Sequence, residues 1–147
     1  MTSWNFMLAE AGIVERLKAT LQAGPGAWAR AIGTRTELAA VTEEMQLAPA
    51  VYVVYDGFAV LAASEFEASL SHRWMVVIAV ASAAQQREAS ARNQEAGPYM
   101  QEVLAALHGF QAPQCRSPLV PVTPPRPYFS PAKFAYYPLA FACESYH

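Results

Sequence analysis

A single carboxylate interrupts the most apolar part of the sequence, and it is the first residue whose chemistry needs an explanation. In the stretch APAVYVVYDGFAVLAAS, residues 48–64, Asp56-Gly57 separates two apolar runs. The carboxylate could be a catalytic acid, or the dipeptide could form a tight hairpin turn or a bulge within one long strand. No histidine, cysteine or second carboxylate stands close to Asp56 in sequence, so a catalytic role is the least favoured of the three.

The other residues with reactive or metal-binding side chains are scattered along the chain. The histidines His72, His108 and His147 stand apart, without the clustered ligands of a metal site. Cys115 and Cys143 lack a C-x-x-C spacing, so we expect two free thiols, with a bond between them as the less favoured alternative. The sequence contains neither a phosphate-binding glycine loop nor a G-x-S-x-G nucleophile elbow. It therefore predicts no catalytic residues, no metal and no cofactor.

Two further motifs could bind a partner. Pro118-x-x-Pro121-x-x-Pro124 has the spacing of a polyproline ligand, although an extended linker over its own or a neighbouring subunit is the favoured interpretation. Tyr136-Tyr137 could stack on bases, but a net charge of −2 provides no basic surface for nucleic acid. We expect these tyrosines in the core or in an interface, and no sequence-specific nucleic-acid binding.

The composition indicates a protein that covers apolar surface with other subunits. Hydrophobic residues make up 54% of the 147 residues and charged residues 15%, against usual values of roughly 45–50% and about 25%. So few charges would leave a monomer with exposed apolar area, which favours a homo-oligomer. The length fits a single domain over residues 1–147.

Neither a membrane span nor a signal peptide is expected. The longest apolar run, Trp74–Ala81, is far shorter than the ~20 residues that cross a bilayer. The N-terminus carries no basic residues before its apolar part and contains Glu10, so we expect synthesis in the cytoplasm.

An alternating pattern predicts a long strand over residues 70–82. One of its two faces is strongly apolar and consists of Leu70, His72, Trp74, Val76, Ile78 and Val80. A strand of this length needs a partner, and residues 50–62 supply one only if they run through Asp56-Gly57 without turning. We therefore predict a bulge at Gly57 and the hairpin loop at residues 63–69, with a tight turn at Asp56-Gly57 as the alternative.

Three helices are predicted around this hairpin. Apolar residues at helical spacing indicate helices over residues 5–22 and 93–108, and a capping box indicates a short one over residues 35–45. Gly109 is expected to stop the helix at 93–108. Pro98 is expected near the first turn of that helix, where proline is tolerated.

The remaining strands are weaker. Residues 28–32 predict a short strand, and residues 134–141 predict a terminal strand in which Pro138 indicates an edge position or a bulge. The proline-rich segment 113–131 is expected to be an extended, irregular connection. Together these elements predict an α+β fold: an antiparallel or mixed sheet of about four strands containing a long hairpin, with two main helices packed on one face.

Five segments, taken in order, resemble a known protein family. AIGTRTELAAV, PAVYVVYDG, RWMVVIAVASA, AGPYMQEVLAALHGFQAP and FAYYPLAF are similar to segments of the tail terminator proteins of long-tailed phages and Mu-like prophages. The resemblance runs from about residue 10 to residue 142. These motifs are structural rather than catalytic, and the length of the proline-rich segment departs from the pattern.

The resemblance implies a structural protein of the virion, with no catalytic residues and no cofactor. Such proteins assemble in the host cytoplasm as a hexameric ring on the head-proximal end of the tail. The ring caps the tail tube, stops its polymerisation and offers the surface for head–tail joining. The implied partners are other copies of the chain, the major tail tube protein and the head–tail connector or neck protein. The alternative is a head-completion or other neck protein, with an enzyme of unrecognised type least favoured.

Two exposed places are expected to contact neighbouring subunits or tail proteins. Phe66 lies between two glutamates in the predicted loop 63–69, where an aromatic ring has no local reason to be unless it anchors a partner or folds back onto its own sheet. The end of the proline-rich segment could reach a neighbour at low entropic cost. The predicted interface residues are Glu65, Phe66, Glu67, Arg126, Tyr128 and Phe129.

Overall fold

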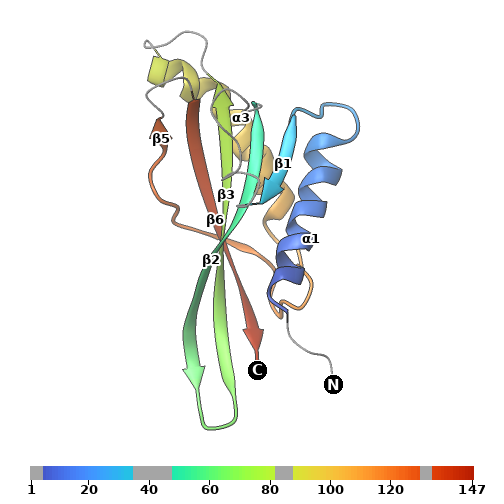
Figure 1. Ribbon diagram of the computed structural model, residues 1–147, viewed down its shortest axis with the longest axis vertical. Coiled ribbons are helices and arrows are strands. Elements are labelled where there is room, and N and C mark those ends of the chain that lie inside the picture. The colour runs from blue at the N-terminus through green and yellow to red at the C-terminus, as the bar shows by residue number, and fades with distance from the viewer. Residues whose placement is uncertain (1–4, 35–47, 82–87, 130–133) are drawn as a thin grey trace.

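The computed structural model describes residues 5–34, 48–81, 88–129 and 134–147 (Figure 1). Its helical elements are α1 (Met7–Leu17), the π-helical turn η1 (Lys18–Gln22) that continues α1, and α3 (Glu88–Leu107). Its strands are β1 (Ala31–Thr34), β2 (Ala50–Ala63), β3 (Ala68–Ala81), β4 (Val120–Val122), β5 (Tyr128–Phe129) and β6 (Phe134–Tyr146). The predicted helix at 35–45 falls outside the described residues.

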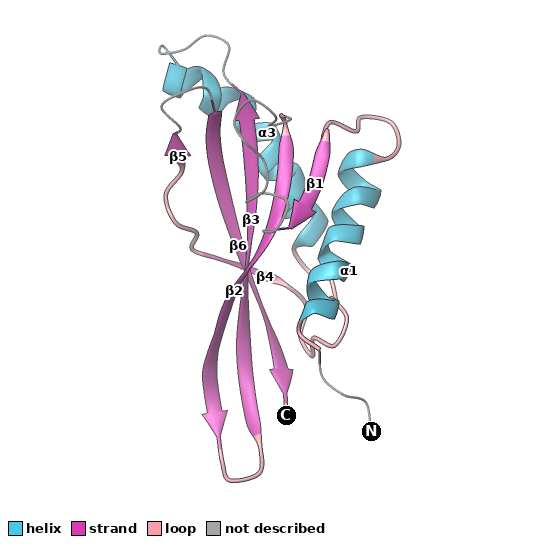
Figure 2. Cartoon of the chain, viewed as in Figure 1, coloured by secondary structure: helices cyan, strands magenta, loops and turns pink. Residues whose placement is uncertain are grey.

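These strands form one mixed sheet, which confirms the predicted α+β class (Figure 2). The order is β1-β2-β3-β6-β4, and β5 also pairs with β6. β1 runs parallel to β2, and the other pairs are antiparallel. The sheet has six strands rather than about four, because the proline-rich segment contributes β4 and β5.

One face of the sheet is covered by the two main helices. Ile13 and Leu17 of α1 and Val103 and Leu107 of α3 are fully buried in the same apolar cluster as Trp74 of β3. The alternation predicted for β3 is confirmed, because the buried residues of its apolar face are Leu70, His72, Trp74, Val76, Ile78 and Val80. Burial of this face against the helices supplies the main hydrophobic stabilisation of the fold.

The predicted bulge at Gly57 is confirmed. Tyr55 pairs with Trp74 and Phe58 with His72, so the two residues Asp56 and Gly57 stand opposite one residue of β3. Gly57 has φ = 86°, which a residue with a side chain adopts only at a cost. The extra residue also shifts the strand's alternation by one, so Tyr55 and Phe58 lie on the same face of the sheet. The loop joining β2 to β3 closes between Ser64 and Glu67, within the predicted range.

Two local predictions were wrong. Residues 28–30 do not belong to a strand, because the N–H groups of Trp28 and Ala29 donate to the carbonyl of Leu21 at the end of η1. β1 begins only at Ala31, where pairing with β2 starts. Pro98 does not lie near a first turn but inside α3, which begins at Glu88. Pro98 is exposed, so water can bond the carbonyl that its missing N–H leaves free.

β6 is not an edge strand, which corrects the prediction for the C-terminal segment. It pairs with β3 along its whole length. On its other side β5 covers Ala135 and Tyr136, and β4 covers Ala140 to Ala142. Pro138 lies between these two short strands, at a position where the outer side of β6 has no described strand partner. A proline, which has no N–H to donate, is therefore tolerated in an interior strand.

Candidate functional site

The hairpin of β2 and β3 continues past the helices as an arm, which we define as residues 56–72 (Figure 1). The chain near the start of α1 touches only the base of the arm. There the ring of Phe6 packs edge-on against Phe58 and His72, with centroids 6.0 and 4.6 Å away. No described helix lies over the rest of the arm, and residues 58–67 are exposed to solvent in the free chain.

The arm presents apolar side chains instead of the polar ones expected for such a position. Its exposed large apolar residues are Phe58, Val60, Leu61 and Phe66. Phe66 is 86% exposed, so its ring does not fold back onto its own sheet. Soluble proteins rarely expose contiguous apolar patches, so the arm is a candidate contact surface.

The tip of the arm is a defined turn. The N–H of Ser64 donates to the carbonyl of Glu67 at 2.7 Å, and the N–H of Glu67 donates to Ser64 Oγ at 3.2 Å. The Glu67 carboxylate beside the hydroxyl of Tyr146 raises the pKa of that tyrosine. Glu65 and Phe66 remain exposed at the outermost point. The turn therefore holds an aromatic ring and a carboxylate outward together.

The edge of β2 along the arm is open. β1 pairs with β2 only at Ala50 to Val53. From Val54 to Ala63 no strand among the described residues covers the outer edge of β2. Soluble proteins usually protect such an edge with prolines or charges, and here Asp56 is the only charged residue and proline is absent.

A second apolar patch lies at the opposite edge of the sheet, on β4 and β5. Its exposed residues are Val120, Tyr128 and Phe129, and Tyr128 is 61% exposed. The Tyr128 ring stacks on Tyr136 at 6.0 Å, and the Phe129 ring meets Tyr137 edge-on at 6.1 Å. The two predicted contact regions are thus separate surfaces on opposite edges of one sheet, with exposed Arg126 beside the second.

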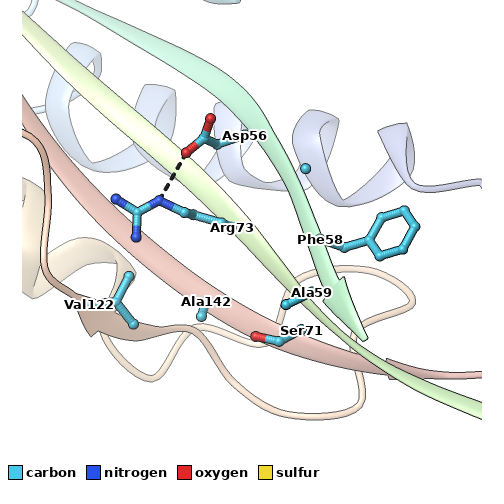
Figure 3. Close-up of a pocket in the computed structure, with 8 residues that line it drawn as sticks. Asp56, Phe58, Ala59, Ser71, Arg73, Val122 and Ala142 are labelled. Atoms are coloured by element: carbon cyan, nitrogen blue, oxygen red, sulfur yellow. Dashed lines mark hydrogen bonds and ion pairs between the residues drawn. The ribbon is translucent and has the colours of Figure 1, made fainter. Parts of the chain in front are cut away.

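The bulge forms one wall of an open pocket of about 310 Å³ on the sheet face opposite the helices (Figure 3). Arg73 Nε donates to Asp56 Oδ2 at 2.9 Å, and Arg73 Nη2 donates to the carbonyl of Thr123 at 2.9 Å. Val122 and Ala142 supply apolar lining. Asp56 is thus paired with a cation, and among the residues that line the pocket Ser71 supplies the only hydroxyl, with no histidine or cysteine beside it.

The described part of the chain contains no group of three or more His, Cys, Asp or Glu residues able to hold a metal ion. Within the same residues no helix is long and apolar enough to cross a membrane. A search of curated proteins found no match. The family model of the phage tail terminator protein, however, matches residues 4–146, nearly the whole chain.

The chain belongs to the phage tail terminator family. This finding confirms the resemblance carried by the five sequence segments. The family is one of structural phage tail proteins, so a role in the virion tail follows from membership. Contact with other tail components follows as well.

Sequence reasoning missed a chain of polar side chains at the base of the arm, buried at its two central members His72 and Ser145. Tyr55 Oη lies 2.8 Å from His72 Nδ1, His72 Nε2 lies 2.6 Å from Ser145 Oγ, and Ser145 Oγ lies 2.9 Å from His147 Nε2. One arrangement satisfies every group while all stay neutral. In it Tyr55 donates to His72, His72 donates to Ser145, and Ser145 donates to His147.

This chain of hydrogen bonds is structural in the tail terminator. His72 is 2% exposed and Ser145 1%, so a substrate cannot reach the serine–histidine pair. Burial, together with the nearby His147, lowers the pKa of His72 and keeps the ring neutral. The signal in the sequence was a polar residue at an inward position of an apolar strand, but the partner on β6 could not be found without the register.

Proposed function

We propose that this tail terminator, acting as one domain over residues 1–147, assembles into a closed hexameric ring at the head-proximal end of the tail. The ring caps the tail tube, stops its polymerisation and offers the surface on which the head–tail connector docks. The observation that carries the proposal is the pair of different apolar patches on opposite edges of one sheet. A cyclic assembly of identical subunits needs such a pair, because each subunit meets its two neighbours through different surfaces.

The contact between neighbouring subunits joins the arm of one to the β4–β5 edge of the next. Phe58, Val60 and Leu61 supply apolar area on one side, and Tyr128 and Phe129 supply aromatic rings on the other. Tyrosine and phenylalanine are enriched at the buried centres of interfaces.

Charge and backbone chemistry agree with this pairing. Glu65 at the tip of the arm carries an exposed negative charge, and Arg126, near Tyr128 in sequence, carries an exposed positive charge. The two charges attract each other across the proposed contact. Pro121 in β4 and Pro127 before β5 have no N–H groups, so the second edge is poorly suited to continue a sheet. The contact therefore rests chiefly on side chains, with Phe66 as the anchor at the tip.

Ring closure explains how the protein would end a polymer. A closed ring uses both patches of every subunit, so no patch remains to recruit a further copy. The two end faces of the ring are then left for other proteins, one for the major tail tube protein and one for the connector or neck protein. The protein would thus reside in the virion at the head-proximal end of the tail, after assembly in the host cytoplasm.

Electron microscopy of lysates from a phage that lacks this chain tests the proposal. Loss of the cap should give tail tubes of uncontrolled length and heads that stay unjoined. Tails of normal length with detached heads would instead assign the protein to head completion at the neck. Native mass spectrometry of the purified protein tests the ring separately, and a stable monomer at all concentrations and in the presence of tubes would contradict it.

A further inference from the structure

The two cysteines of the chain, far apart in sequence, meet in the fold. The N–H of Arg116 bonds the carbonyl of Glu144, which brings the adjacent Cys115 and Cys143 together, and each thiol shifts the pKa of the other. Both are free, and they are the only cysteines in the sequence. Cys143 belongs to the apolar core cluster, and Cys115 packs against that cluster from the loop after α3.

Backbone hydrogen bonds hold this loop on the last strand. The N–H of Arg116 donates to the carbonyl of Glu144 at 2.7 Å, and the N–H of Glu144 donates to Ser117 Oγ at 2.8 Å. The N–H of Cys115 donates to the carbonyl of Ala112 at 3.1 Å, and the side-chain amide of Gln111 donates to the carbonyl of Cys115. The residues on either side of the thiol pair are thus fixed, and the contact is not a chance approach of two mobile side chains.

The two thiols differ in access and in acidity. Cys143 is 1% exposed, whereas Cys115 is partly exposed and open to a small oxidant. The neighbouring Cys115 lowers the pKa of Cys143, and Cys143 raises the pKa of Cys115. The buried indole N–H of Trp74, which has no hydrogen-bond partner of regular geometry, also favours a negative charge on the Cys143 sulfur. The pair can therefore lose one proton and share the other.

We propose that Cys115 and Cys143 form a reversible intramolecular disulfide when the protein meets a peroxide. After the pair has lost one proton, transfer of the shared proton to Cys143 puts the negative charge on the accessible sulfur of Cys115. That sulfur attacks hydrogen peroxide, the O–O bond breaks, and a sulfenic acid and hydroxide form. Cys143, giving its proton to this hydroxide, attacks the Cys115 sulfur, and the S–S bond forms as a second hydroxide leaves. In total two thiols are oxidised, and one peroxide is reduced to two waters.

The disulfide would close a loop that contains β4 and β5. It joins the start of the proline-rich segment to the end of β6, so the second apolar patch lies within the closed loop. Thiols stay reduced in the cytosol, whereas disulfides persist outside the cell. A tail protein leaves the cell with the virion, so the bond would form after assembly and hold the patch in place. This benefit rests on the proposed ring, whereas the disulfide itself does not.

Thiol counting on the purified full-length protein tests the chemistry. Hydrogen peroxide should reduce the number of thiols that Ellman's reagent detects in denaturant from two to none. The intact mass should fall by two hydrogen atoms, the chain should run as a monomer on a non-reducing gel, and a digest should contain a Cys115–Cys143 linked peptide. The melting temperature should rise by roughly 5 °C or more and return to its initial value with dithiothreitol.

Cys115→Ser is the matched control, because it keeps the buried Cys143. In this variant peroxide should leave the melting temperature unchanged and produce no linked peptide. Two thiols that survive peroxide, a mass gain of oxygen atoms without a linked peptide, or a disulfide between chains would each overturn the proposal. Native mass spectrometry of the reduced protein tests ring formation without the disulfide. A failure of the proposed ring can therefore be told apart from a failure of disulfide formation.

Discussion

Arg73 and Asp56 form an ion pair across the bulge of β2, with 2.9 Å between Nε and Oδ2. Arg73 also donates to the carbonyl of Thr123, so one side chain ties β2, β3 and the connection between β4 and β5 together. The carboxylate that interrupts the apolar sequence is therefore a surface contact at a bulge. Its side chain is 45% exposed and that of Arg73 is 35% exposed, so water screens the pair.

Asp56→Asn should change the free energy of unfolding by less than about 1 kcal/mol, because exposed ion pairs contribute little. Urea denaturation of Asp56→Asn, Arg73→Gln and the double variant measures the coupling between the two residues. Arg73→Gln alone should cost more than Asp56→Asn, since it also removes the bond to Thr123. A turnover on any substrate that disappears in Asp56→Asn would overturn the structural role.

Gly57→Ala should destabilise the protein by about 1–2 kcal/mol, because φ = 86° is strained for a residue with a side chain. Gly97→Ala is the matched control. Gly97 lies within α3, but a Cβ there would crowd the ring of Pro98, which offsets the gain in helix propensity, so alanine should change stability little. Urea denaturation should therefore show a clear loss for Gly57→Ala and little change for Gly97→Ala. Equal shifts would show that the bulge does not require glycine.

Phe66→Ser and Tyr128→Ala should leave the melting temperature of the monomer nearly unchanged, because both side chains are more than half exposed. Each should weaken ring assembly or tail attachment by about 2 kcal/mol or more, the usual effect of truncating an aromatic anchor. Leu8→Ser, which alters an exposed apolar residue on α1, is the control and should leave assembly intact. Thermal melts paired with a tail-binding assay check this. Loss of folding in step with binding would place these aromatics in the core.

Lowering the pH below about 6.5, the ordinary pKa of histidine, should destabilise the protein. Burial lowers the pKa of His72 in the folded state, so the unfolded chain takes up a proton first and stability falls as pH decreases through this window. Urea denaturation from pH 8 to pH 5 measures the slope. His72→Gln should flatten it, whereas His108→Gln, at an exposed position, should leave it as in the native sequence. An unchanged slope in His72→Gln would exclude His72 as its source.

The polar chain around His72 should also be sensitive to its partner on β6. Ser145→Ala leaves the buried Nε2 of His72 without its hydrogen bond, which typically costs about 1–3 kcal/mol. Ser117→Ala, whose hydroxyl bonds the exposed N–H of Glu144, is a matched serine control and should cost less because water can replace it. Comparable losses in both variants would argue against a special role for the buried serine.

Much of the fold was predictable from local patterns. The alternation over residues 70–82, the bulge at Gly57 and the stop at Gly109 depend on the sequence around each position. The spacing of apolar residues along the chain indicates which face of a helix or strand packs against the core. A glycine often marks a position with positive φ, which other residues avoid. The length of the strand at 70–82 favoured a bulge at Gly57 over a tight turn there, because a long strand needs a pairing partner of similar length.

Only the tertiary structure decided which elements are neighbours. Pro138 indicated an edge strand or a bulge, yet β4 and β5 pair with the outer side of β6 and make it an interior strand, and Pro138 lies in the gap between them. The contact of Cys115 with Cys143 and the bond of His72 to Ser145 likewise depend on strand register between distant segments. Local propensity carries no information about such pairings. They are set by burial of the sheet against both helices, which depends on all the strands and helices together and on no single segment.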